Sequence, residues 1–304
     1  MKGAWRRIAR FDLDTSVAPW AATHAALPVI EPVRDGVWTL YLSLRDDQGR
    51  ARIGRTQLTL DPPALTPLEP DPILDLGPLG AFDDSGVVTS SLMMTGGVRY
   101  LFYTGWSLGV TVPFYLMAGV AISRGGEPFK RPSPAPLLDR NRFDPFLTAS
   151  PFVAVEDDRW RMWYVSGSDW TTTPAGPQHR YNIRYAESED GRAWRREGVV
   201  CVDYGDASEY AFARPWVVTD PDMYRMWFAV RGDRYRIGFA ESLDGLSWAR
   251  RDDVAGLLPS DAGWDSEMVE YPCVFDHDGI RYMLYNGNDY GRTGLGVARW
   301  EQPM

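Results

Sequence analysis

The sequence predicts an all-β protein, a single five-bladed β-propeller over residues 1–304, and an internal repeat is the first observation behind this prediction. A short aromatic strand recurs five times: Thr39-Leu40-Tyr41, Leu101-Phe102-Tyr103, Met162-Trp163-Tyr164, Met226-Trp227-Phe228 and Met283-Leu284-Tyr285. Eleven residues before each copy lies the anchor of a preceding strand: Pro28, Ser90, Pro151, Pro215 and Pro272. The anchors are 62, 61, 64 and 57 residues apart. Self-similarity at a nearly fixed period, built from short strands, is typical of propeller blades.

The order of strands and turns is the second observation, and it predicts four strands in each blade. After the anchor strand and the aromatic strand, a third strand follows at residues 51–58, 115–123, 181–188, 235–242 and 294–300. Two of these third strands run on into Asp-Gly-x-x-Trp, which begins a fourth strand. Pairs such as Asp190-Gly191, Asp244-Gly245 and Asp278-Gly279 supply the tight turns between strands.

The two ends of the chain are expected to pair with each other. The fifth unit ends after its third strand, at Trp300, so its outer strand must come from elsewhere. The segment Gly3-Ala4-Trp5-Arg6-Arg7 resembles the fourth strand that follows Asp190-Gly191. We therefore expect the N-terminal strand to close the ring of blades and to remove an exposed sheet edge.

Composition is the third observation, and it also excludes several classes of function. Aromatic residues make up 13% of the chain and include 13 Trp, which suits sheets packed face to face through large side chains. The net charge of -9 argues against a nucleic-acid partner, because phosphate backbones are bound by clustered Lys and Arg. The N-terminus has no long apolar run, so we expect a soluble, cytoplasmic protein without a membrane partner. Cys201 and Cys273 lack the paired spacing of zinc or redox motifs, so no disulfide, metal or cofactor is expected.

One rim of the propeller is predicted to hold the functional site. In an up-and-down blade, the loops that enter the first strand and those that join the second and third strands lie at the same rim. A concave mouth with carboxylates, guanidinium groups and exposed Trp is the default binding-site hypothesis. The predicted catalytic residues are Glu270, Asp84 and His24. The predicted substrate-binding residues are Arg214, Glu209, Trp106, Asp169, Trp170, Tyr271, Asn288 and Asp289.

The Met-Trp-Tyr strands and the Tyr-Ala-x-Ser-x-Asp-Gly-x-x-Trp elements resemble the five-bladed propellers of the glycosidase superfamily, over nearly the whole chain. That superfamily includes arabinanases and xylosidases, levansucrases and invertases, and mannoside phosphorylases. The resemblance implies acidic residues on the first strands of successive blades: an Asp before the first proline, a second Asp in a later blade and a Glu as the acid. Leu27 stands before Pro28 here, so the usual first carboxylate is absent. Glu270, two residues before Pro272, has the spacing of the family's Glu-Gly-Pro acid motif, although it lies in the fifth blade.

Two roles are open for Glu270 and for Arg214. Glu270 lies between apolar Val269 and Tyr271, and burial beside another carboxylate would raise its pKa and suit it to acid catalysis. Its structural alternative is an ion pair with Arg214 across the channel. An inward Arg214 could bind a carboxylate or phosphate with two hydrogen bonds, or it could balance the charges of Glu209 and Glu270.

The other candidates also have alternatives. His24 could replace the missing Asp as a general base, bind a channel metal such as the calcium of some family members, or be a structural, hydrogen-bonded His. Asp83 and Asp84 precede Ser85-Gly86 and also read as turn residues; we expect Asp84, nearer the strand, to face the channel. Trp106 and Trp170 could stack on sugar faces.

The leading functional prediction is a carbohydrate-active enzyme that acts on a sugar or glycoside in the central channel. Its partner would be a small sugar or sugar-derived molecule. One alternative is a related propeller recruited to a non-hydrolytic biosynthetic step, such as a cyclase, isomerase or lyase reaction. Another is a noncatalytic module that binds a sugar or sugar nucleotide.

Overall fold

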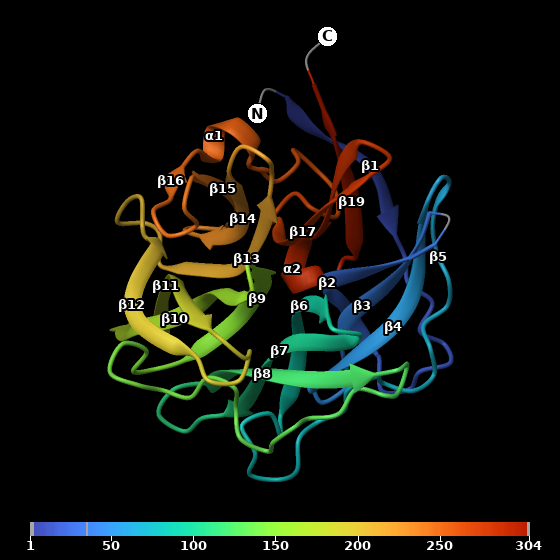
Figure 1. The fold of residues 1–304 in the computed structure, drawn as a ribbon. Coiled ribbons are helices and arrows are strands. Elements are labelled where there is room, and N and C mark those ends of the chain that lie inside the picture. The colour runs from blue at the N-terminus through green and yellow to red at the C-terminus, as the bar shows by residue number, and fades with distance from the viewer. Residues whose placement is uncertain (1–2, 35, 303–304) are drawn as a thin grey trace.

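The computed structural model describes residues 3–34 and 36–302, and nearly all of its regular structure is β-strand (Figure 1). The strands are β1 (Ala4–Phe11), β2 (Thr23–Arg34), β3 (Val37–Arg45), β4 (Ala51–Leu60), β5 (Pro63–Leu65), β6 (Gly86–Thr95), β7 (Val98–Leu108), β8 (Phe114–Arg124), β9 (Thr148–Glu156), β10 (Arg159–Thr173), β11 (Gly176–Ser188), β12 (Arg195–Val202), β13 (Ala211–Thr219), β14 (Tyr224–Arg231), β15 (Tyr235–Ser242), β16 (Ala249–Arg250), β17 (Glu270–His277), β18 (Ile280–Asn286) and β19 (Leu295–Glu301). The helices of this described region are α1 (Asp252–Ala255) and α2 (Asn288–Gly291). None of its helices has the length and hydropathy needed to cross a bilayer.

Antiparallel pairing divides the strands into successive sets, which Figure 1 shows arranged around a common centre. The sets are β2 to β5, β6 to β8, β9 to β12, β13 to β16, and β17 to β19 with β1. The first strand of each set lies nearest the centre (Figure 1). Parallel contacts of Ala51 with Gly86 and of Tyr181 with Ala211 join neighbouring sets into larger sheets. The observed architecture is therefore an all-β propeller fold, as the repeat predicted.

The second set departs from the expected four strands. Beyond β8, the chain makes only isolated bridges, of Ala118 with Leu138 and of Ile122 with Lys130. The segment between these bridges contains three prolines at positions 132, 134 and 136. Proline has no N–H to donate to a sheet ladder, so a continuous outer strand cannot form there.

The N-terminal strand lies beside the last strand of the chain, as the sequence predicted. β1 pairs antiparallel with β19 from Ala4 opposite Glu301 to Phe11 opposite Leu295. Trp5 is buried between Trp227 and Trp300, with ring centroids 6.1 and 5.1 Å away, and its indole N–H donates to a backbone carbonyl. β1 thus contributes both a sheet edge and a core side chain.

A buried acid, a tyrosine and an arginine recur together in three of the sets. The triads are Asp83, Tyr103 and Arg131; Asp144, Tyr164 and Arg196; and Asp265, Tyr285 and Arg7. In each triad the tyrosine hydroxyl and the arginine both donate to the acid, which lies in the loop before the first strand. In the third triad the arginine comes from β1, so the N-terminal strand also neutralises a buried acid.

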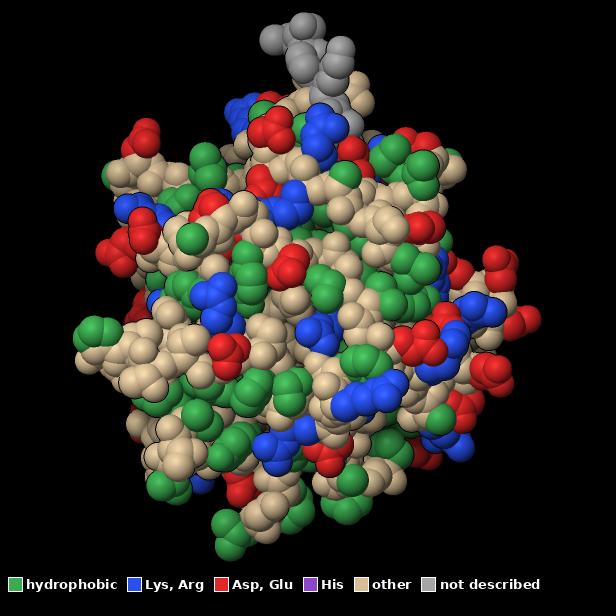
Figure 2. All heavy atoms as spheres, turned by 90° about the vertical axis from the view of Figure 1, so that its left-hand side faces the viewer, with side chains coloured by type: hydrophobic (Ala, Val, Ile, Leu, Met, Phe, Trp, Pro, Cys, Tyr) green, Lys and Arg blue, Asp and Glu red, His purple; other side chains and the backbone are tan. Residues whose placement is uncertain are grey.

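Acidic and basic side chains are mixed on the face that Figure 2 shows, which includes the side of β12 and β16 in Figure 1. On this face the basic side chains do not gather into a continuous patch (Figure 2). A polyanion would need such a patch, so this face offers no evident site for one.

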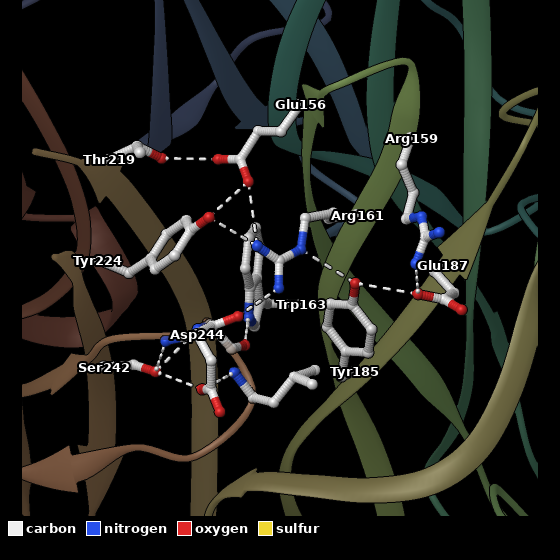
Figure 3. Close-up of polar contacts among 12 residues, drawn as sticks. Glu156, Arg159, Arg161, Trp163, Tyr185, Glu187, Thr219, Tyr224, Ser242 and Asp244 are labelled. Carbon is white, nitrogen blue, oxygen red and sulfur yellow. Dashed lines mark hydrogen bonds and ion pairs between the residues drawn. The ribbon is translucent and has the colours of Figure 1, made fainter. Parts of the chain in front are cut away.

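Arg161 joins the third strand set to the fourth through hydrogen bonds (Figure 3). Its guanidinium donates to Glu156 at 3.0 Å and to the Tyr224 hydroxyl at 2.7 Å. It also donates to the Tyr185 hydroxyl and to the backbone carbonyl of Asp244. Since Tyr224 and Asp244 belong to the fourth set, these bonds hold neighbouring sets together.

We expect Arg161→Gln to lower the free energy of unfolding by about 1–3 kcal/mol, because Glu156 would lose its charged partner in a partly buried position. The matched control is Arg159→Gln, on the same strand, whose side chain is 62% exposed and reaches only Glu187 at 3.4 Å. That control should change the free energy by less than about 0.5 kcal/mol. Urea denaturation measures both values, and equal effects of the two variants would contradict a role of Arg161 in joining the two strand sets.

Candidate functional site

Positive φ angles mark the innermost strands near the centre of the fold. The residue before the anchor proline has a φ of 52° at Leu27, 47° at Ser150, 53° at Arg214 and 57° at Tyr271. The pairing of these strands with their neighbours shifts register at the same points. Non-glycine residues rarely adopt φ above zero, and such outliers gather at functional sites. These positions are therefore candidates for a functional site.

Glu270 begins β17, directly opposite Asn286 at the end of β18. It is 0% exposed, and neither carboxyl oxygen has a hydrogen-bond partner among the described residues. Burial raises the pKa of Glu270 well above its ordinary value; the nearby Tyr271 hydroxyl and the charges of Arg231 and Arg45 oppose this shift without offsetting it. Burial therefore favours the protonated form of Glu270, which carries a proton that it can donate.

Aromatic side chains cluster near Glu270, at the rim where the sequence predicts a channel mouth. His179 stacks on Tyr181, with ring centroids 4.5 Å apart and ring planes at 8°. Burial raises the pKa of Tyr235 well above its ordinary value, and Tyr181 and Glu270 add to the shift. Tyr181 begins the buried part of β11, and Tyr235 begins β15. Such rings offer flat faces on which a sugar can pack.

Arg231, the last residue of β14, lies among tyrosine rings at this mouth. Its Nη1 donates to the Tyr290 hydroxyl at 2.6 Å. Its guanidinium carbon lies 5.5 Å from the ring centroid of Tyr210 and 5.1 Å from that of Tyr235. Tyr290 belongs to α2, which Figure 1 places near the centre of the molecule, and it too has a positive φ, of 58°.

Asn288 and Asp289 lie in α2 and differ in their surroundings. The side-chain carbonyl of Asn288 accepts the N–H of Glu267 at 2.7 Å, and its amide donates to the carbonyl of Gly263. Asn288 therefore holds the loop in place instead of presenting a free amide to a ligand. Asp289 is exposed, and its carboxylate lies 3.5 Å from Arg292.

His24 lies near the start of β2 with a φ of 63°. It lines a cavity of about 210 Å³ together with Arg292 and Thr293, and its Nδ1 is 3.0 Å from the Thr23 hydroxyl. Burial and the positive charge of Arg45 lower the pKa of His24 to about 4. The imidazole is therefore neutral at neutral pH, and its role as a general base stays a prediction.

Arg214 braces the innermost strands. Its side chain is fully buried, and it donates to the carbonyl of Thr89 at 3.0 Å and to that of Pro28 at 2.5 Å. These bonds join β13 to β6 and β2. The ion pair with Glu270 that the sequence left open does not form in the described chain. The contacts describe a bracing role, and ligand clamping by Arg214 stays a prediction.

Glu209 lies in an ion-pair cluster, and its predicted contact with a ligand stays a prediction. It is buried and accepts hydrogen bonds from Arg236 at 2.5 Å, from Arg250 at 2.6 Å and from the N–H of Gly205 at 2.7 Å. Burial alone would raise the pKa of Glu209, but these hydrogen bonds and the charge of Arg250 lower it. Both carboxylate oxygens are occupied, so the role seen here is structural.

Asp84 and Asp83 differ in their surroundings. Asp84 accepts the N–H of Gly80 at 3.0 Å and the hydroxyl of Ser85 at 2.9 Å, as a loop-capping residue does. Asp83 is the buried acid and belongs to the triad with Arg131. The negative charge of Asp289 also raises the pKa of Glu270. Asp84 as the partner carboxylate stays a prediction.

The remaining candidates lie on the aromatic strands themselves, a few residues after the repeated aromatic motif. Trp106 on β7 lies directly over Gly86, where an added Cβ would be 1.9 Å from the indole nitrogen. Asp169 is exposed and accepts the backbone N–H of Trp170 at 2.8 Å. Trp170 packs edge-on against His179. Trp170 thus belongs to the aromatic surroundings of the mouth.

Sequence reasoning missed Tyr181, Tyr235 and Arg231 as candidate site residues. The two tyrosines begin the repeated Tyr-x-Ile segments, so the repeat itself made them resemble core residues. Arg231 was visible as a charged residue at the end of a second strand, at the predicted rim. No group of three or more His, Cys, Asp or Glu residues that could hold a metal occurs in the described parts of the chain.

We expect Glu270→Gln to change how stability depends on pH. Neutral Glu270 contributes fully to the free energy of unfolding below the ordinary carboxyl pKa. This contribution is lost as pH rises through the raised pKa of the folded protein. Gln cannot ionise, so the variant should gain stability relative to the parent by up to about 1.4 kcal/mol per pH unit in this range. Glu209→Gln is the control of opposite sign, because its lowered pKa makes its contribution disappear as pH falls. Urea denaturation from about pH 4 to pH 8 tests both, and parallel curves for Glu270→Gln and the parent would contradict a buried neutral carboxyl.

Curated relatives match almost the full length of the chain. The uncharacterized proteins Rv1502 and MT1551 of two strains of Mycobacterium tuberculosis are each 43% identical over 296 residues, which is 97% of this chain and 98% of theirs. No family model matches the chain.

Several solved glycoside hydrolases have a similar structure. One described as a glycoside hydrolase gives a TM-score of 0.71 at 16% identity and covers 99% of this chain and 93% of its own. A thermostable family-43 glycoside hydrolase gives 0.68 at 16% identity, with 94% and 96% covered. An exo-1,5-alpha-L-arabinanase from a bovine ruminal metagenomic library gives 0.65 at 13% identity, with 96% of both chains covered. At these identities the likeness concerns the fold. The chain therefore belongs to the family of the mycobacterial protein Rv1502 and has the β-propeller fold of the glycosidase-like superfamily.

Proposed function

We propose that this protein is a carbohydrate-active enzyme with Glu270 as its proton donor. The observation that carries the proposal is a fully buried carboxyl at the start of β17, which has no hydrogen-bond partner among the described residues and whose protonated form is favoured by burial, in a fold shared with glycoside hydrolases. We further propose that the strand sets are five blades of one propeller and that β1 closes the ring; its pairing with β19 supports this. The reaction would take place at the channel mouth, between Glu270 and the surrounding tyrosines.

Glycoside cleavage requires an acid that protonates the leaving oxygen and a base or nucleophile on the other face of the sugar. Burial favours the protonated form of Glu270, which supports its assignment as the acid. Leu27 occupies the position of the usual first carboxylate, so the second group must come from elsewhere. Neutral His24, at the start of the neighbouring innermost strand, is our candidate base, and the charge of Asp289 acts on both His24 and Glu270.

A second candidate function is a non-hydrolytic reaction on a sugar, and the apolar Leu27 favours it. Hydrolysis needs an activated water, and a leucine cannot activate one. Product analysis in H₂¹⁸O separates the two reactions, because only hydrolysis incorporates the heavy oxygen into the sugar. A non-hydrolytic enzyme would give a product without the label.

The test of the proposal is a turnover screen of the full chain against aryl glycosides, oligosaccharides and sugar phosphates. An enzyme of the proposed kind converts at least one member of the panel, and Glu270→Gln loses this turnover while it still binds the ligand. A protein that binds a sugar and converts nothing would be a binding module. A conversion that survives in Glu270→Gln at full rate would remove Glu270 from the reaction.

A further inference from the structure

Arg231 and Arg45 make no ion pair with any carboxylate in the described chain, although both are partly buried. Acidic residues outnumber basic ones by 41 to 32, so carboxylates are plentiful in this protein. The neighbouring Arg236 and Arg250 are paired with Glu209 in the usual way. Arg231 keeps a hydrogen bond to the Tyr290 hydroxyl, but no carboxylate of the described residues balances either guanidinium, and burying an uncompensated charge is costly. Two such arginines therefore need an explanation.

The two arginines end corresponding strands at the same rim. Arg45 is the last residue of β3, and Arg231 is the last residue of β14. Glu270 begins β17 opposite the end of β18, which places it at the same level of its set. The exposed Asp289 does not neutralise either arginine by contact, because its ion pair is with Arg292.

We propose that the mouth binds an anionic sugar, whose phosphate or carboxylate group is held by Arg231 with the help of Arg45. This inference rests on the proposed function and names its class of substrate. The guanidinium of Arg231 can form two parallel hydrogen bonds with either anion, and one Nη already has its orientation set by Tyr290. The rings of Tyr210 and Tyr235 flank the same guanidinium, and Tyr210, which is only partly buried, can pack against the sugar.

Glu270 fits this picture because burial favours its protonated form, which does not repel an anion. An ionised carboxylate in its place would oppose the ligand charge across a medium of low dielectric constant. Neither of its oxygens has a hydrogen-bond partner among the described residues, so a sugar hydroxyl that reached them would satisfy a buried polar group. The charge of the mouth and the state of its acid thus favour the same kind of ligand.

Isothermal titration of the full chain with glucose, glucose 6-phosphate, mannose 6-phosphate, glucuronate and inorganic phosphate tests the inference. We expect at least one anionic sugar to bind about tenfold or more tightly than glucose, as a charged hydrogen-bonded contact would give. Arg231→Gln should remove this preference, and Arg231→Lys should restore part of it. Arg234→Gln is the matched control, since Arg234 is exposed in the next loop and donates only to the carbonyl of Ser266. Thermal melting confirms that each variant is folded.

The possible outcomes distinguish a phosphate ligand from a carboxylate ligand. They also distinguish the anion-site inference from the proposed catalytic role of Glu270. A preference limited to the phosphates assigns a sugar phosphate, and one limited to glucuronate assigns a sugar acid. Equal binding of neutral and anionic sugars, binding of none, or a preference that survives in folded Arg231→Gln overturns the inference. If anionic sugars bind through Arg231 but Glu270→Gln turns them over at the parent rate, the proposed catalytic role fails and the anion site stands. If neutral glycosides are turned over in a way that depends on Glu270 and no preference for anions is found, the anion site fails and the proposed catalytic role stands.

Discussion

Replacing Glu270 with Gln should lower turnover by about 10²–10⁴-fold, because the amide keeps the shape of the acid and has no proton to donate to a leaving group. Ligand affinity should change little, since the introduced amide would keep a donor and an acceptor in the same place. The measurement is kcat and KM on a substrate found in the screen. The matched control is Glu267→Gln, three residues earlier, where the side chain is exposed and the kinetics should not change.

The pH profile of the same reaction provides a second test of Glu270 as the proton donor. Activity should fall as pH rises through the raised pKa of Glu270, because the ionised form is not a proton donor. Asp289→Asn removes a negative charge that raises this pKa and should move the alkaline limb to lower pH. Asp84→Asn would move it as well if Asp84 faces the channel as predicted. An active Glu270→Gln variant with an unmoved profile would exclude this acid and direct attention to His24.

Deleting residues 1–13 should remove most of the stability of the protein, with a loss on the scale of the roughly 5–15 kcal/mol that holds an average domain together. The deletion exposes the edge of β19 and removes Trp5, a buried side chain of a kind whose loss alone costs about 3–5 kcal/mol. It also leaves Asp265, which is 2% exposed, without the Arg7 that donates to it at 2.7 Å. An uncompensated buried charge of this kind costs about 3–5 kcal/mol.

Thermal and urea denaturation of the truncated chain measure this loss, and single variants divide it. Trp5→Ala and Arg7→Gln should each be strongly destabilising. Arg6→Ala is the control on the same strand, since its side chain is 66% exposed and pairs only with Glu301. The closure proposal would be abandoned if the truncated protein melts at the temperature of the parent.

The fold could be predicted from the sequence because its determinants are local and repeated. Apolar and aromatic residues at strand spacing, with Asp-Gly turns between them, specify where strands begin and end without reference to distant residues. The likeness between residues 3–7 and a fourth strand likewise predicted that β1 would lie beside β19. The expected outer strand of the set β6 to β8 is missing, because the prolines at 132, 134 and 136 cannot donate sheet hydrogen bonds. These prolines do not alter the repeated aromatic strands from which four strands per blade were predicted.

Which acids are free for chemistry was decided only by the tertiary structure, because the partner that neutralises a buried charge lies far away along the chain. Glu209 and Glu270 look alike in sequence, yet Glu209 meets Arg250, 41 residues later, and Glu270 meets no cation in contact. Arg214 resembles a ligand clamp until it bonds to the carbonyl of Pro28, 186 residues earlier. Burial and pairing set the pKa of each group, and both depend on how the strand sets pack around the centre.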